Sequence, residues 1–528
     1  MRIVALGLLT GLTLVGGAGI AHDLPKLIER DGRHALLVDG APFLMLGAQV
    51  NNSSNWPAML PKVWPAIDQL HANTVEVPMA WEQIEPKEGQ FDFSFLDTLL
   101  AEARAHKVRL VLLWFATWKN NGPNYAPAWV KLDNKRFPRV INAKNETMNS
   151  LSPLFQATLD ADRKGFVTFL RHLKEVDPEH TVIMVQVENE TGTHGAVRDH
   201  SPAAEKLFKS PIPAALARAS KKSGDWRQAF GQDADEFFHA WFIARFVEQV
   251  AAAGKAEYPL PLYVNAALRD AFHRQDPLTY SSGGPTWNVL DIWKAAGSSI
   301  DVIGPDIYSP NYDSYRRTLE QYSRPDNALF VPETGNQAEY ARYFFEVIGR
   351  RGIGFAPFGM DFTGYANFPL GAKKVDAELL EGFALNYRLV APFDRELAAL
   401  SFAGKVWGAA EPTDVHEQRL GLGRWQVALS YGRPQFGMEP PTGNPTPSGG
   451  ALIAELGPDE YLVTGYHVRV NFERADNGGR HFLLARVEEG HYENGRWIFE
   501  RLWNGDQTNY GLNFTSIAQL LRVTLATY

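Results

Sequence analysis

Two glutamates that follow apolar segments are the residues of this chain best suited to do chemistry. Glu190 follows an apolar run that begins at Thr181, and Glu333 follows one that begins at Ala328. A pair of carboxyl groups can act as acid and nucleophile, and a retaining glycosidase needs such a pair about 5–5.5 Å apart. A lone glutamate at the end of a strand is more often a solvated loop residue. It is the presence of two such glutamates that favours catalysis.

A second carboxylate close to Glu190 is a competing candidate for the acid. Side chains alternate along a strand, so Gln186, Glu188 and Glu190 are expected to share one face. A carboxylate buried inside a protein is costly unless it is paired or used. We interpret Glu188 as an internal, paired structural carboxylate. Glu190, at the carboxyl end of the segment, is expected to reach the mouth of the site.

The elements that must position these glutamates form a regular series. Eight short, apolar segments alternate with amphipathic, helix-like stretches, which is typical of an α/β fold with a parallel sheet. The eight segments are Phe43–Val50, Thr74–Met79, Arg109–Phe115, Thr181–Val187, Leu260–Asn265, Asp301–Tyr308, Ala328–Pro332 and Gly352–Phe358. Eight such units predict a (β/α)8 TIM barrel, in which strands four and seven lie across one central pocket. An open doubly wound sheet is the alternative, but no glycine-rich dinucleotide fingerprint follows the first segment.

The spacing of the eight segments also predicts where extra chain is inserted. The gaps after the third and fourth segments are the long ones, so residues 116–160 and 191–234 are expected to build up the loops of the active face. We predict that the barrel covers residues 22–395.

The chain changes character near residue 396, and we predict a separate all-β, sandwich-like domain over residues 396–528. Tyr431–Gly450 is dense in proline and glycine, which indicates a loop. Strand-like runs follow at Tyr461–Phe472, His481–Glu488 and Arg496–Trp503. The dipeptides Asn477-Gly478 and Asn494-Gly495 lie between these runs as hairpin turn signals.

Composition excludes several classes of function. The 528 residues include no cysteine, so disulfides, thiolate metal sites and a cysteine nucleophile are excluded. A net charge of −8 gives no support to binding of nucleic acid or of an anionic membrane. The 14 histidines show no metal-ligand spacing, and no phosphate loop is present, so we expect neither a metal nor a cofactor.

The first 21 residues have the pattern of a secretory signal peptide. Arg2 precedes a short, mostly apolar run, and small residues, Gly19 and Ala21, stand where cleavage occurs. The run is too short to span a bilayer, which needs about 20 apolar residues. We therefore expect a protein that is exported to the periplasm or beyond and is not membrane-bound after cleavage. A membrane anchor is the alternative.

Two motifs resemble those of a known family. Gln186-Val187-Glu188-Asn189-Glu190 is similar to the Gln-x-Glu-Asn-Glu motif of the family 35 β-galactosidases, which are retaining β/α-barrel glycosidases. The segment Trp81–Phe93 is similar to that family's Trp…Glu-Pro…Gly…Phe-Asp-Phe segment after strand two. The resemblance covers about residues 35–395, and the β domain looks like the appendage of a compact bacterial branch of the family.

The resemblance implies roles for particular residues. Glu190 would be the acid/base and Glu333 the nucleophile, while Asn189 would hold the 2-hydroxyl of the sugar. Tyr308 matches a tyrosine that orients the nucleophile in related barrels, although a rim aromatic without a catalytic role is an equal alternative.

Two positions depart from the family pattern. Thr117 stands where many members have a glutamate that grips galactose hydroxyls, and Pro78 stands where many have a tyrosine. Other residues must therefore recognise the sugar in this protein. The candidates are Gln49, Asn51, Asn52, Trp118 and Asn121, and Trp118 and Trp287 are the predicted aromatic platforms.

The expected function is that of a retaining, exo-acting β-galactosidase that releases terminal β-galactosyl residues from small oligosaccharides by double displacement. Xyloglucan fragments are the natural substrate that the resemblance suggests. Two alternatives stay open: a retaining β-glycosidase or glucanase for other sugars, and a catalytically silent barrel that binds carbohydrate. The sequence leaves the oligomeric state open, with a homodimer as one option.

Overall fold

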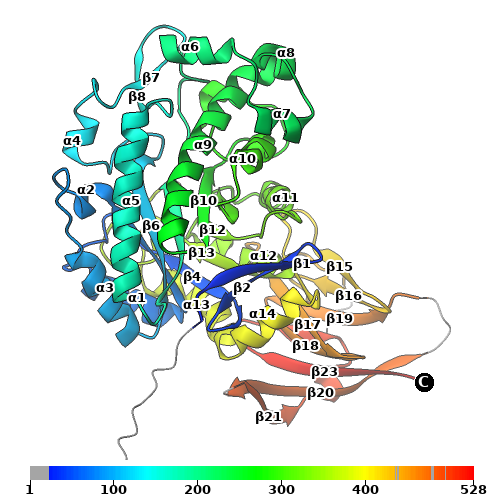
Figure 1. Cartoon of the computed structure of the whole chain (residues 1–528). Coiled ribbons are helices and arrows are strands. Elements are labelled where there is room, and N and C mark those ends of the chain that lie inside the picture. The colour runs from blue at the N-terminus through cyan, green and yellow to red at the C-terminus, as the bar shows by residue number, and fades with distance from the viewer. Residues whose placement is uncertain (1–22, 435, 437–438, 477–480, 494) are drawn as a thin grey trace, which may run out of the picture.

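Eight parallel strands close into a barrel, which confirms the predicted fold (Figure 1). The computed structural model describes residues 23–434, 436, 439–476, 481–493 and 495–528, so the predicted signal peptide lies outside the described residues. The barrel strands are β4 (Met45–Gln49), β5 (Thr74–Ala80), β6 (Arg109–Lys119), β9 (Val182–Asn189), β10 (Leu262–Ala267), β11 (Val302–Ile307), β12 (Val331–Thr334) and β13 (Gly354–Pro357). Each coincides with one of the eight segments expected from the sequence.

A helical layer surrounds the barrel. Its main members are α1 (Leu60–Leu70), α3 (Ser94–Ala105), α5 (Gln156–Val176), α9 (Ala234–Glu257), α10 (Leu290–Ala296), α11 (Tyr312–Tyr322), α12 (Tyr343–Gly349) and α13 (Ala377–Val390). Strand β6 shows why both faces of the wall are apolar. Leu112 and Trp114 pack in the helix-side core, while Leu113 and Phe115 pack in the barrel interior. No helix among the described residues has the length and apolar content needed to cross a membrane.

An N-terminal β-meander closes the amino end of the barrel. It consists of β1 (Lys26–Arg30), β2 (Arg33–Val38) and β3 (Ala41–Phe43). Leu36 and Val38 share the interior cluster with Val111 and Phe330. The barrel interior is thereby filled at this end, and a site can open only at the carboxyl ends of the strands.

The insertions lie after the third and fourth barrel strands, where the sequence predicts them, and they gather at the upper end of the molecule in Figure 1. Their elements are α4 (Ala128–Lys131), β7 (Arg139–Ile141), β8 (Thr147–Leu151), α6 (Pro202–Phe208), α7 (Ala214–Ser220) and α8 (Trp226–Phe230). The remaining short helices of this half are α2 (Trp81–Ile84), η1 (Gly231–Asp233), η2 (Pro277–Thr279), η3 (Trp287–Val289) and η4 (Ala338–Tyr340).

The C-terminal part is a sandwich of two antiparallel sheets, as predicted. The six-stranded sheet contains β14 (Val406–Ala410), β17 (Gly450–Gly457), β18 (Glu460–Tyr466), β23 (Leu520–Thr527), β20 (Phe482–Glu493) and β21 (Arg496–Leu502). The four-stranded sheet contains β15 (Glu417–Leu422), β16 (Trp425–Ser430), β19 (Val468–Arg474) and β22 (Leu512–Phe514). One further short helix, η6 (Gly505–Gln507), precedes β22.

The predicted strand Tyr461–Phe472 is two strands, one in each sheet. The chain breaks at His467, whose φ of 48° is left-handed and cannot continue a strand. Strands β20 and β21, on either side of the turn predicted at Asn494-Gly495, pair antiparallel with Glu493 opposite Arg496, while Asn494 itself lies outside the described residues. Asn477-Gly478 lies outside the described residues.

The sandwich has an apolar core of its own, and the outer face of its six-stranded sheet also packs against the barrel helices. Along β17, Ala451 and Ile453 face the sandwich core, while Leu452 and Ala454 belong to the cluster of the barrel helices. The backbone of β14 approaches α12 so closely that a Cβ added to Gly408 would lie 2.4 Å from the carbonyl oxygen of Phe345. Two helical segments, η5 (Ala391–Phe393) and α14 (Asp394–Phe402), lead from one part to the other, so the boundary predicted at 395/396 falls inside α14.

Candidate active site

Three carboxyl groups meet at the carboxyl ends of the barrel strands. Glu190 follows β9, Glu333 is in β12 and Asp306 is in β11, and one oxygen of each lies within 4.8 Å of the others. The two predicted catalytic glutamates are therefore brought together. Their nearest oxygens are closer than the roughly 6.5–9.5 Å that an inverting glycosidase leaves for a water molecule.

Glu333 is held on both of its oxygens. The hydroxyl of Tyr308 donates a hydrogen bond to Oε1 at 2.5 Å, and Nε2 of Gln49 donates one to Oε2 at 2.9 Å. Burial and the charge of Glu333 raise the pKa of Tyr308 well above its ordinary value, so the phenol stays a donor. Tyr308 and Gln49, both predicted as site residues, thus fix the orientation of the carboxylate, which is buried with 5% of its surface exposed.

Glu190 is positioned by its backbone as well as by its surroundings. Its amide N–H donates to Oδ1 of Asn265 at 2.9 Å, and Nδ2 of Asn265 donates to Asp306 at 2.6 Å. Burial and the charge of Glu333 raise the pKa of Glu190 to about 7, against opposing contributions from the Lys119 ammonium and a hydrogen bond with Asp306. A carboxyl group that keeps its proton near neutral pH is suited to act as a general acid.

Glu188 does not share a face with Glu190, so the predicted alternation is wrong at this point. Its Oε2 accepts a hydrogen bond from the backbone N–H of Trp118 at 2.8 Å, and it lies beside Asp162 of α5, on the helix side of the wall. Both glutamates have left-handed backbones, with φ of 64° at Glu188 and 44° at Glu190, each at a cost of about 1–3 kcal/mol. These kinks turn Glu188 outward and Glu190 into the mouth. Burial and Asp162 raise the pKa of Glu188 well above its ordinary value.

Asn189 lies between the two glutamates in the chain and is fully buried. Its Oδ1 accepts a hydrogen bond from Nζ of Lys119 at 2.8 Å. Its Nδ2 is buried and has no hydrogen-bond partner in the protein. A buried donor without a partner is uncommon and is explained if a ligand atom satisfies it.

Trp118 is a core residue, so its prediction as a sugar platform is wrong. It is fully buried and packs edge to face on Phe246 of α9, with ring centroids 5.0 Å apart. The sequence suggests a loop here because the apolar run weakens, but β6 continues to Lys119 through an irregular register that turns the indole toward the helices.

Asn121 also has a different place from the one predicted. It is in the tight turn between Lys119 and Gly122, where it and Asn120 have φ of 71° and 53°. Asparagine tolerates this backbone better than most residues. The side chain borders a second pocket of about 400 Å³, lined also by Asn124, Asn149 and His194, and not the cavity that contains Glu190.

The cavity beside the carboxylates has a volume of about 390 Å³. Glu190, Asp306 and Tyr308 line it, together with the loop after β10, which includes Arg269 and Asp270. Trp287 does not line it directly. The indole ring packs 5.0 Å from the Arg269 guanidinium, and its N–H donates to the carbonyl oxygen of Asp270, so this predicted platform supports the loop from behind.

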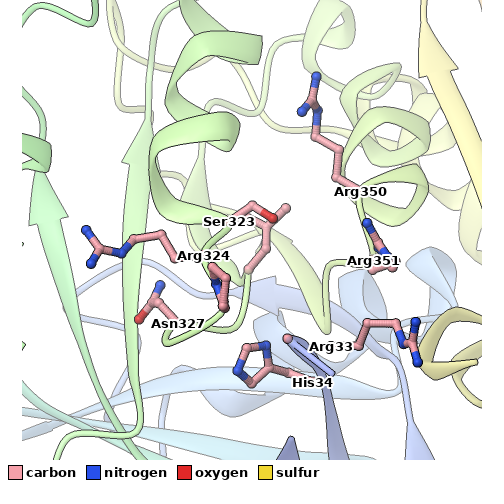
Figure 2. A pocket seen from close by; sticks show the side chains of 10 residues that line it. Arg33, His34, Ser323, Arg324, Asn327, Arg350 and Arg351 are labelled. Atoms are coloured by element: carbon pink, nitrogen blue, oxygen red, sulfur yellow. The ribbon is translucent and has the colours of Figure 1, made fainter. Parts of the chain in front are cut away.

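A basic pocket of about 240 Å³ at the amino end of the barrel is a weaker candidate. Figure 2 shows that the guanidinium groups of Arg33, Arg324 and Arg350 point out of the pocket. They form ion pairs with Asp31, Asp326 and Glu346, at 3.0, 2.8 and 2.9 Å respectively. These arginines therefore do not converge on a ligand.

Three residues of the site were not singled out from the sequence: Asp306, Asn265 and Lys119. Asp306 is two residues before Tyr308 on the same strand, so alternation alone could have pointed to it. Asn265 ends a predicted strand and Lys119 lies four residues beyond the predicted end of another, at Phe115, and neither carries a pattern of its own. The spacing of the three carboxylates would also suit a cation, yet donors already occupy both oxygens of Glu333, and the pKa of Glu190 is raised to about 7. These features favour acid–base chemistry.

Comparison with known proteins matches two parts of the chain to protein families. Residues 56–241, about a third of the chain, match the model of glycoside hydrolase family 42. That model is described as beta-galactosidase. The resemblance expected from the sequence was to family 35, whereas the matching model is that of family 42. Residues 383–515 match a domain of unknown function, DUF5597, a range that contains η5, α14 and every strand of the sandwich except β23.

Several similar proteins are described as beta-galactosidases. A beta-galactosidase from Xanthomonas manihotis is 28% identical over 227 residues, which are 36% of this chain and 34% of that protein. The chain thus matches about a third of the length of this curated relative. Crystal structures of beta-galactosidases from Bacillus circulans sp. alkalophilus and the psychrophilic Marinomonas ef1 align with TM-scores of 0.49 each. They have 12% and 13% identity, and the alignments cover 67% of this chain and 57% and 61% of those chains.

Proposed function

We propose that this protein is a retaining, exo-acting β-galactosidase that hydrolyses terminal β-galactosyl residues of oligosaccharides. The observation that carries the proposal is the pairing of Glu190 and Glu333, whose oxygens lie within 4.8 Å and which differ in environment. Glu333 is held as a carboxylate by two donors, while Glu190 retains its proton to about pH 7. The descriptions of the matching family model and of the Xanthomonas relative support the choice of galactose.

In the first half of the reaction, Glu333 attacks the anomeric carbon and Glu190 protonates the departing oxygen. The bond between the sugar and the leaving group breaks as the bond to Glu333 forms, which gives a covalent glycosyl-enzyme. Tyr308 and Gln49 hold the attacking carboxylate in one orientation, so little motion is needed at the moment of attack.

In the second half, Glu190 is a carboxylate and accepts a proton from water, which attacks the same carbon and restores Glu333. The negative charge of Glu333 that raised the pKa of Glu190 is absent in the covalent intermediate. The pKa of Glu190 is therefore lower at the stage when it must act as a base. The product keeps the configuration of the substrate.

The natural substrate belongs to the same proposal. Xyloglucan fragments are the substrate suggested by the resemblance to the compact bacterial branch of family 35 and by the expected export, and no particular residue selects them; the model that matches the chain is that of family 42. The signal-like segment, residues 1–21, supports export to the periplasm or beyond. Thr117 favours a second candidate, a retaining glycosidase for another sugar, because its hydroxyl donates to Asp162 and is buried away from the cavity. It cannot replace the glutamate that grips galactose in many family members.

A panel of nitrophenyl glycosides tests the proposal. We expect the β-galactoside to be cleaved with a higher kcat/KM than the β-glucoside, α-arabinoside and β-fucoside. NMR should show the β-anomer of galactose as the first product. A preference for another sugar would support the second candidate, and an α-anomer first product would contradict the retaining mechanism. Absence of cleavage across the panel would favour a carbohydrate-binding barrel.

The pKa of Glu190 predicts the alkaline side of the pH profile. Because the acid must be protonated and its pKa is raised to about 7, kcat/KM should fall on the alkaline side with an apparent pKa near 7. A ¹³C NMR titration of Glu190 in Glu333→Gln provides the control. Without the charge of Glu333, the pKa of Glu190 should be lower. An unchanged pKa in this variant would contradict the proposed coupling.

A further inference from the structure

Lys119 is a buried cation that the mechanism described above does not use. It is the last residue of β6, and 4% of its surface is exposed. Its Nζ donates to Oδ1 of Asn189 and to Oδ1 of Asn120. The backbone hydrogen bonds between Lys119 and Gly122 close the turn that supplies Asn120. The ammonium group is therefore fixed in one place beside the acid/base.

The contact with Lys119 decides which way the amide of Asn189 points. An ammonium group can only donate hydrogen bonds, so it must face the amide oxygen. The amide nitrogen is then the end that faces away from Lys119, and it is buried without a partner in the protein. This nitrogen belongs to the residue immediately before Glu190, and a ligand oxygen is the partner that such a buried donor lacks.

The same ammonium balances a concentration of negative charge. Glu190 is faced by Glu333 from β12, by Asp306 from β11 and by Lys119 from β6. Glu76 from β5 adds a further buried carboxyl group near Asp306. Lys119 is the cation among these groups, and its charge lowers the pKa of both Glu190 and Asp306 against the effect of burial.

We propose that Lys119 is a positioning residue for glycosyl transfer, which holds the amide N–H of Asn189 toward the sugar and supplies the positive charge beside which Glu190 ionises in the second half-reaction. This inference rests on the proposed function and adds a determinant, Lys119, that lies two residues after Thr117, one of the positions that depart from the family pattern. It predicts that Lys119 and Asn189 act as one unit.

The test is a double-mutant cycle in the full-length enzyme. We expect Lys119→Met to lower kcat/KM about 10–100-fold through loss of positioning, and Lys119→Arg to keep most of the activity. Lys119→Met combined with Asn189→Ala should be no worse than Asn189→Ala alone, because a residue that acts through Asn189 has no further effect once it is gone. A loss of kcat/KM in the double variant equal to the product of the two single-variant losses would overturn the proposal. A kcat/KM for Lys119→Met within twofold of wild type would also overturn it.

The pH profile separates this role from simple support of the fold. Removal of the positive charge should move the alkaline limb of kcat/KM to higher pH in Lys119→Met and Lys119→Gln, while Lys119→Arg leaves it in place. If the alkaline limb of kcat/KM does not move in either Lys119→Met or Lys119→Gln, the electrostatic role proposed for Lys119 is overturned. Lys119→Gln keeps one donor for Asn189 and serves as the second variant if the methionine variant fails to fold.

Two controls make the outcome specific. Lys131, in the same inserted region, pairs with Glu82 at 2.6 Å on the surface, so Lys131→Met should leave kcat/KM and the pH limb unchanged. Glu333→Ala distinguishes failure of the role proposed for Lys119 from failure of the proposed function. If Glu333→Ala is inactive and Lys119→Met is not impaired, only the role of Lys119 fails; if Glu333→Ala is active, the proposed function fails with it.

Discussion

Replacement of Glu333 by alanine is expected to lower kcat at least about 10⁴-fold, the scale seen when a nucleophile is removed from an enzyme. The reason is that no other described group can take its place. Asp306 has a pKa raised well above its ordinary value by burial and by Glu333 and Glu190. It also accepts a hydrogen bond from Asn265 that holds it aside. A single-turnover assay with a nitrophenyl galactoside measures the loss.

Thermal unfolding and a matched variant keep this result interpretable. Glu339→Ala replaces a glutamate of η4, outside the site, and should retain full activity. An unchanged Tm together with normal turnover in Glu333→Ala would remove Glu333 as the nucleophile. A 2-fluoro glycoside that labels the wild-type enzyme at Glu333, and does not label the alanine variant, would identify the attacking atom by mass spectrometry.

The second large effect is expected for Glu190→Ala, and it should depend on the leaving group. General acid catalysis contributes about 10²–10⁴-fold, so hydrolysis of an oligosaccharide, whose leaving group needs a proton, should fall by that amount. A dinitrophenyl galactoside needs no proton to depart, so formation of its covalent intermediate should be almost unaffected. The slow step then becomes the attack of water.

Azide should rescue the Glu190→Ala variant. The anion fits the space left by the side chain, attacks the glycosyl-enzyme without base assistance and gives β-galactosyl azide, which NMR identifies. The same variant of Glu188 is the matched control, because that carboxylate lies outside the wall beside Asp162 and should show no azide effect. Rescue of Glu188→Ala in place of Glu190→Ala would reverse the assignment of the acid.

The barrel could be predicted from the sequence because its strands are signalled locally. Each is a short apolar run bounded by polar residues, and the two glutamates mark the ends of β9 and β12 directly. Pairing across the barrel then follows from topology alone, since strands four and seven lie opposite each other. The catalytic pair required no knowledge of side-chain packing.

The surrounding residues could not be predicted in the same way, because their roles depend on local departures from regular strands. Left-handed backbones at Glu188 and Glu190 break the alternation on which the face assignment rested. An irregular register at the end of β6 turns Trp118 into the core and brings Lys119 beside Asn189. A periodic pattern cannot reveal such irregularities, and they concentrate at this site, as strained backbone often does at functional positions.

The close packing of β14 on α12 has a consequence for engineering. The sandwich cannot be removed or exchanged between enzymes as an independent domain. The face of its sheet that carries Leu452 packs against the barrel helices, so removal would expose apolar surface on both parts. A chimera that joins this barrel to a foreign sandwich would need to transplant α12, α14 and the glycine-lined seam at Gly408 together. Strand β12, which carries Glu333, lies just before α12 in the chain. A chimera with a new interface at α12 would therefore also have to keep the Glu333 carboxylate in its place.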